Sequence, residues 1–111
     1  MWPGAASIKW PIPWHPIVDG AIDDRIATEL YNEVGEQHAL YGIKVRPVAR
    51  REDCDDVLFE LLDESARFAV VHLTYSRHAE TDPRWPGTEV YADWAAFERD
   101  RLRPDAEEWA T

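Results

Sequence analysis

The chain has 111 residues, of which 12 are lysine or arginine and 22 are aspartate or glutamate, so its formal net charge is −10 at pH 7. Nonspecific binding to nucleic acid or to anionic membranes is therefore disfavoured, because phosphate contacts need a basic surface. Apolar residues make up 45% of the sequence, which argues against wholesale disorder. The length fits one compact domain.

No apolar run reaches the roughly 18–20 residues that a bilayer-spanning helix needs, and the first residues lack the pattern of a secretory signal. We therefore expect a soluble, cytoplasmic protein. A single cysteine, Cys54, cannot form an intramolecular disulfide, and its acidic neighbours are expected to raise the pKa of its thiol. His38, His72 and His78 lack metal-ligand spacing, and no glycine-rich phosphate loop occurs, so neither a metal nor another cofactor is expected.

Residues 1–18 contain four prolines and three tryptophans, a composition that excludes the interior of a helix. We expect an extended arm whose Trp10 and Trp14 pack onto the domain and close its core. A second interpretation is a proline-rich ligand for an aromatic groove, although no PxxP pair lies in a polar, solvated context.

Residues 20–36 are predicted to form the first helix. Asp19 can cap its N-terminus, and Gly35 is a suitable C-terminal stop. Apolar residues recur every four positions and form one stripe: Ile22, Ile26, Leu30 and Val34. The opposite, polar face carries Arg25, Glu29, Asn32, Glu33 and Glu36.

Three strand-like runs follow, at residues 43–50, 56–62 and 67–75. Pro47 cannot donate a hydrogen bond to a neighbouring strand, so the first run is predicted to be an edge strand. The third run is almost continuously apolar, as is typical of a central strand covered on both faces. The short linkers favour a small three-stranded antiparallel β-meander.

Residues 76–88 are predicted to be a loop, because two prolines and a glycine interrupt any regular pattern. A second helix is expected to start near Asp93 and to end at Pro104. The predicted fold is a single α+β domain in which two helices pack on the small sheet. Its parts are an extended arm (1–18), an α+β core (19–103) and an acidic tail that is expected to fray (104–111).

Four short motifs stand out between residues 38 and 86: HALYG from residue 38, DDVLF from residue 55, VVHLTY from residue 70 and DPRWP from residue 82. Together they resemble a family of small bacterial proteins whose motifs read HPLYG, DDVLF, VVHLTW and DPRWP. The resemblance covers residues 10–100, with Ala39 in place of proline and Tyr75 in place of tryptophan. It implies one self-contained bacterial domain and carries no assigned activity.

The densest polar cluster begins at the end of the third strand-like run and continues into the loop, where functional residues often lie. His72 is a candidate general base, with Glu80 or Asp82 orienting its second ring nitrogen. The alternatives are contact with a ligand or partner, and a buried structural histidine. Asp55 and Asp56 are adjacent carboxylates, but neighbouring strand residues point to opposite faces, so a turn is the simpler role.

Arg84 and Trp85, in the DPRWP motif, belong to the residue types that dominate binding hot spots. We therefore predict a binding surface formed by His72, Tyr75, Arg84 and Trp85. The alternative is that Trp85 lies in the core and Arg84 pairs with a carboxylate. Asp82, which precedes a proline, is expected to form an Asx-type turn.

Charge is unevenly distributed, with four basic residues and no acid at 44–51 and seven acids and no base at 52–64. The two segments can neutralise each other, or the acidic one can meet a basic partner. We favour a non-catalytic module of the inhibitor or immunity type that binds another protein; a DNA mimic has the same charge signature. The alternative is a small-molecule binding protein or small enzyme with a site around His72 and residues 76–88. Self-association through the edge of the first strand is a third hypothesis, which Pro47 opposes.

Overall fold

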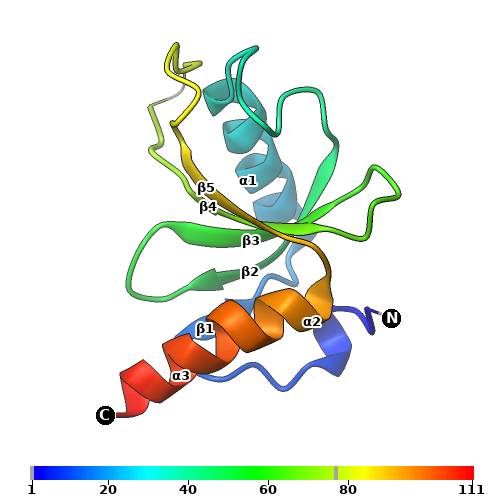
Figure 1. Ribbon diagram of the computed structural model, residues 1–111, viewed down its shortest axis with the longest axis vertical. Helices are drawn as coiled ribbons and strands as arrows, with labels where there is room; N and C mark the ends of the chain where they lie inside the picture. Colours follow the sequence, from blue (N-terminus) through cyan, green and yellow to red (C-terminus); the bar gives the residue numbers. More distant parts are fainter. Residues whose placement is uncertain (1, 77) are drawn as a thin grey trace.

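The computed structural model of the chain describes residues 2–76 and 78–111 and contains a five-stranded antiparallel sheet. The predicted α+β class is confirmed, and the three predicted strands are present and pair antiparallel. The prediction of only three strands was wrong, because one further strand extends the sheet on each side (Figure 1). The strands neighbour each other in chain order: β1 (Trp14–Pro16), β2 (Val45–Arg51), β3 (Asp56–Leu61), β4 (Phe68–His72) and β5 (Gly87–Tyr91).

The two additional strands have weak sequence signals. β1 is three residues long and lies inside the proline-rich arm. It pairs with Ala49 to Arg51, so β2 is not the edge strand that was predicted, although Pro47 lies outside this pairing. β5 begins at Gly87, within the predicted loop, and most of its residues are exposed or half-buried. An alternation of buried and exposed positions is therefore missing from the very segments that complete the sheet.

The sheet separates two hydrophobic cores, each covered by a helix (Figure 1). α1 (Gly20–Glu33) covers one face and buries Ile26 and Leu30 against Val57 and Phe59. Asp19 caps α1 as predicted, since its carboxylate accepts a hydrogen bond from the backbone N–H of Ala21 at 2.9 Å. β4 lies between β3 and β5 and contributes side chains to both cores, as expected for a central strand.

The opposite face of the sheet is covered by a C-terminal helical segment that does not end at Pro104. It consists of α2 (Trp94–Phe97), a π-helical turn η2 (Glu98–Leu102) and α3 (Arg103–Ala110). Pro104 lies in the first turn of α3, immediately after the π-helical turn. A proline disrupts a regular helix because it lacks an N–H and its ring crowds the preceding turn, and a change in hydrogen-bond pattern at this point accommodates it. The predicted end of the helix was therefore wrong.

The N-terminal arm packs against this second helical segment. It includes a short 3-10 helix, η1 (Ala5–Ser7). Trp14 is fully buried and lies edge-on to Phe97, with 5.6 Å between ring centroids. Trp10 contacts Trp94 at 5.6 Å, and Trp2 contacts the same ring at 4.4 Å. The arm therefore closes the second core with aromatic rings, as predicted for Trp10 and Trp14.

Among the helices of residues 2–76 and 78–111, none is long and apolar enough to cross a membrane.

Candidate functional site

The segment from Ala79 to Pro86, which contains Arg84 and Trp85, is attached to the rest of the fold at both ends. At its start, the backbone N–H of Glu80 donates to the carbonyl oxygen of Glu33 at 3.0 Å. A side chain at position 35 would collide with the Glu80 carbonyl oxygen, so Gly35 permits this close approach. Figure 1 shows the segment, in yellow-green to yellow, beside the end of α1.

The other end of this segment is anchored by a buried histidine. The Nδ1 atom of His38 accepts a hydrogen bond from the N–H of Leu40 at 3.0 Å, so its Nε2 atom carries the proton. Nε2 donates to the carbonyl oxygen of Pro86 at 3.0 Å, and the Thr88 hydroxyl donates to the same oxygen at 2.8 Å. His38 is therefore a structural residue that fixes the start of β5.

Asp82 forms the predicted turn and binds the arginine two residues later. Its carboxylate accepts from the Arg84 backbone N–H at 2.9 Å and from the guanidinium Nη2 at 2.6 Å. The side-chain and backbone hydrogen bonds of Arg84 lower the pKa of Asp82 to about 2. The backbone N–H of Trp85 donates to the backbone carbonyl oxygen of Asp82 at 3.1 Å. The backbone around Arg84 and Trp85 is thus held in one conformation.

The side chains of Arg84 and Trp85 face outward. The Arg84 side chain is 81% exposed although it pairs with Asp82, and Trp85 is 51% exposed. The alternative in which Trp85 belongs to the core is therefore wrong, whereas the expected pairing of Arg84 with a carboxylate is present. A large indole is presented to solvent by a segment whose two ends are hydrogen-bonded to the core.

His72 is oriented by a residue other than the two that were predicted. Its Nδ1 atom lies 2.7 Å from Oδ1 of Asp56, directly across β3 and β4. Asp82 instead binds Arg84, and the Glu80 N–H is bonded to Glu33. One signal in the sequence could have identified this partner. If the two strand-like runs on either side of residues 62–67 are paired as an antiparallel hairpin, Asp56 and His72 lie directly opposite each other. His72 is exposed and lines a small pocket of about 210 Å³.

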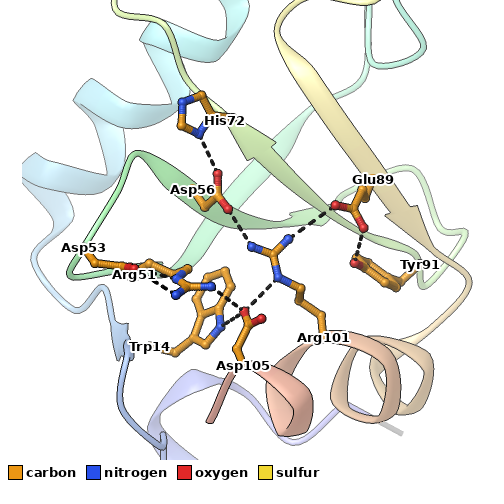
Figure 2. Close-up of polar contacts among 9 residues, drawn as sticks. All are labelled: Trp14, Arg51, Asp53, Asp56, His72, Glu89, Tyr91, Arg101 and Asp105. Atoms are coloured by element: carbon orange, nitrogen blue, oxygen red, sulfur yellow. Dashed lines mark hydrogen bonds and ion pairs between the residues drawn. The ribbon is translucent and has the colours of Figure 1, made fainter. Parts of the chain in front are cut away.

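Asp56 also belongs to an ion-pair network that joins the sheet to the C-terminal helical segment (Figure 2). Its Oδ2 atom accepts from Arg101 Nη2 at 2.5 Å, and Arg101 Nε donates to Asp105 at 2.7 Å. Asp105 also accepts from the Trp14 indole N–H at 2.9 Å and pairs with Arg51 at 3.0 Å. Figure 2 shows Arg101 at the centre of this network, between the two aspartates.

The network shifts the pKa values of its members. Burial opposes ionisation of Asp56, but the hydrogen bonds from His72 and Arg101 outweigh it and lower the pKa of this carboxyl. Burial also opposes the charge of Arg101, yet its bonds to Asp105 and Asp56 raise its pKa. Arg101 and Asp105 carry no sequence signal of this role, because no local pattern places a helix across Pro104 opposite the start of β3.

A second buried carboxylate, Glu33, fixes the backbone that follows β4. One oxygen accepts from the N–H and the hydroxyl of Thr74, at 2.8 and 2.9 Å, and the other accepts from the N–H of Tyr75 at 2.8 Å. Burial would raise the pKa of Glu33, but a hydrogen bond with Glu29 and those from Thr74 and Tyr75 lower it. The assignment of Glu33 to the polar face of the helix was wrong, since this residue is fully buried.

Tyr75 has an unusual backbone conformation and lines a second pocket. Its φ is 56°, in the left-handed region that bulky residues rarely adopt. The pocket measures about 420 Å³ and also contains Arg50 and Asp55. His72 lines a different pocket, so the structure does not bring His72 and Tyr75 into one pocket, and Arg84 and Trp85 line neither of the two.

The charged segments are partly paired, as predicted. Arg51 binds Asp53 at 2.8 Å, and Arg46 lies 3.4 Å from Glu60. The pKa of Cys54 is raised, mainly by burial and further by the charges of Asp56 and Asp53. Asp55 and Asp56 line pockets on opposite faces of the sheet, as expected from strand geometry. No group of three or more histidine, cysteine, aspartate or glutamate side chains arranged to hold a metal ion occurs within residues 2–76 and 78–111.

Comparison with known proteins identifies no relative: no family model matches the chain, and neither a curated protein nor a solved structure is significantly similar to it.

Proposed function

We propose that the protein is a non-catalytic binding module that recognises another protein through Trp85 and Arg84. The observation that supports this proposal is the half-exposed indole of Trp85 on a segment that is hydrogen-bonded to the core at both ends. Tryptophan and arginine supply much of the binding energy in protein interfaces. A segment that is already ordered loses little conformational entropy when it binds, which favours affinity.

The partner expected from this surface has an apolar recess and a basic rim. The recess would accept the Trp85 ring, since burial of a large aromatic side chain is the main apolar gain available here. The Arg84 charge is already balanced by Asp82, so the net charge of −10 governs long-range attraction. Such a charge accelerates association with a basic protein and opposes association with an acidic one. An inhibitor or immunity-type role is consistent with this partner chemistry.

The test is capture of a partner from the native cells with the wild-type protein and with single variants. Trp85→Ala is expected to weaken binding of the captured protein by at least about 30-fold, because a hot-spot residue contributes on the order of 2 kcal/mol. Trp109→Ala is the matched control, since Trp109 is similarly exposed, at 45%, but lies in α3. The proposal fails if the Trp85 and Trp109 variants bind equally well, or if Trp85→Ala unfolds the protein.

A second candidate function is a small-molecule site or small enzyme built on His72. The specific observation is the 2.7 Å bond between Nδ1 of His72 and Asp56, which leaves Nε2 directed away from the carboxylate. A histidine held in this way by an aspartate can act as a general base at Nε2. The adjacent pocket also contains Thr88 and Glu89.

Hydrolysis of p-nitrophenyl acetate tests this second candidate. His72→Gln is expected to lower the rate by about 100-fold, the smaller end of what general-base catalysis contributes. His15→Gln is the control, because His15 is also exposed and also contacts a carboxylate, that of Glu52 at 3.0 Å. Equal rates in the two variants would show that an ordinary surface imidazole explains any hydrolysis.

A further inference from the structure

The pocket beside Tyr75 lies on the face of the sheet that α1 covers, at the end of the β2–β3 hairpin. His15, Arg50 and Val57 are register partners across β1, β2 and β3, so their side chains lie on the same face. Val57 belongs to the core beneath α1, and the pocket opens where this core ends. Asp55 and Tyr75 also line it, together with Cys54 and two charged residues that already have partners, Arg51 and Glu52. Its volume of about 420 Å³ is within the range of small-molecule sites.

Two opposite charges line this pocket without pairing. Within residues 2–76 and 78–111, the side chains of Arg50 and Asp55 form no hydrogen bond or ion pair, and neither does the Tyr75 hydroxyl. Their neighbours are paired: Arg51 binds Asp53, and His15 contacts Glu52. Arg50 and Asp55 nevertheless both lie close enough to influence the Tyr75 phenol electrostatically. Among the described residues, the pocket therefore presents an unpaired cation, an unpaired anion and an aromatic ring together.

The backbone of Tyr75, which carries the aromatic ring of the pocket, is held in place by the carboxylate of Glu33. The left-handed conformation of Tyr75 costs free energy for a residue with a bulky side chain. The carboxylate of Glu33 compensates by binding the Tyr75 N–H from inside the core. Strained residues that are stabilised in this way are common at ligand sites, because strain persists only where the surroundings enforce it.

From this arrangement we infer that the pocket binds a free α-amino acid in its zwitterionic form. The ligand carboxylate pairs with Arg50, the ammonium group pairs with Asp55, and the ligand side chain packs on the Tyr75 ring. A simple anion or a simple cation would satisfy only one of the two charges and would face the other as a like charge. A neutral apolar ligand would remove both charges from water without a partner, which is costly.

The test is an NMR titration of the ¹⁵N-labelled protein with each of the twenty standard amino acids. At least one is expected to produce saturable shifts at the amides of Asp55 and Tyr75. For that amino acid, Arg50→Met and Asp55→Asn should each weaken binding at least about tenfold, since each removes a charge-assisted hydrogen bond. The N-acetyl and carboxamide derivatives of that amino acid each lack one of its two charges, so each should bind at least about tenfold more weakly than the parent amino acid.

Two variants outside the pocket serve as controls. Arg46→Met removes another exposed arginine of β2, and Asp24→Asn removes an exposed aspartate of α1; both should leave affinity unchanged. The inference is overturned if none of the twenty amino acids shifts these amides saturably. It is equally overturned if the pocket variants bind as well as the controls, or if either derivative binds as well as the parent amino acid. Trp85 has no part in this site, so the two binding proposals stand or fall separately.

Discussion

Replacing Arg101 by methionine should lower the free energy of unfolding by about 3–5 kcal/mol. Arg101 is the cation between Asp56 and Asp105, and the side chains of all three are no more than 16% exposed. Methionine preserves much of the apolar stem but removes the cation that two poorly hydrated carboxylates share, so that Asp105 keeps Arg51 and Asp56 keeps only His72. Loss of the guanidinium partner of a poorly hydrated carboxylate is among the more destabilising changes in a protein. Urea unfolding measures the difference.

Arg99→Met is the matched control for this prediction. Arg99 lies two residues earlier in the same π-helical turn and also contacts an aspartate, but its side chain is 69% exposed. Exposed ion pairs contribute at most about 1 kcal/mol. If the two variants lose equal stability, the network of Figure 2 does not hold the C-terminal helical segment to the sheet.

The cost of Arg101→Met should also depend on pH. The pKa of Asp56 is lowered by folding, so its contribution to stability is present above the ordinary carboxyl pKa of 3.8. That contribution is lost as the pH falls through the lower value of the folded state, where Asp56 becomes protonated. A protonated carboxyl no longer needs a cation, so the difference between wild type and variant should shrink below about pH 4. A difference that stays constant down to pH 2 would contradict the electrostatic explanation.

Replacing Glu33 by leucine should lower the free energy of unfolding by about 3 kcal/mol or more. Three donors, the N–H and hydroxyl of Thr74 and the N–H of Tyr75, would lose their acceptor. These hydrogen bonds are partly buried, and a donor shielded from water that loses its acceptor costs about 1–3 kcal/mol, while leucine itself fits the buried position of Glu33. The Tyr75 amide should also exchange with solvent much faster. Glu36→Leu is the control, because Glu36 is exposed and follows the same helix.

The outcome for Glu33 has two parts that can be separated. If stability falls but the exchange rate of the Tyr75 amide does not change, Glu33 stabilises the helix end without holding Tyr75. If neither quantity changes relative to Glu36→Leu, the hydrogen bonds of Glu33 are not important for the fold. The inferred amino acid pocket predicts that both change, because a relaxed Tyr75 would no longer line it.

The local patterns of the chain predicted its regular elements well. The four-residue spacing of Ile22, Ile26 and Leu30 predicts an amphipathic helix, and α1 buries Ile26 and Leu30 against the sheet. The near-continuous apolar run that contains β4 predicts a central strand, and β4 has that position. Asp19 and Asp82 form the predicted cap and turn. These features depend on interactions over a few residues, which a sequence displays directly.

The candidate sites were predicted less well, because they depend on segments that are distant in the chain. A position for Trp85 in the core was the alternative, and only its exposure in the folded structure, on a segment anchored by Glu33 and His38, shows that it faces outward. The partner of His72 is Asp56, 16 residues away, rather than the nearer Glu80 or Asp82. Proximity along the chain was a poor guide, because strand pairing places His72 beside a residue of β3, whereas the loop that follows β4 leads away from it.

For this protein, composition and periodicity were sufficient to establish an acidic α+β fold with a tryptophan-rich arm. The number of strands, the burial of Glu33 and the position of Arg101 between two aspartates were decided only by tertiary packing. The physical reason is that a short or polar segment such as β1 becomes a strand only when a neighbouring strand supplies its hydrogen bonds. A charged side chain, likewise, is buried only where distant groups provide its partners.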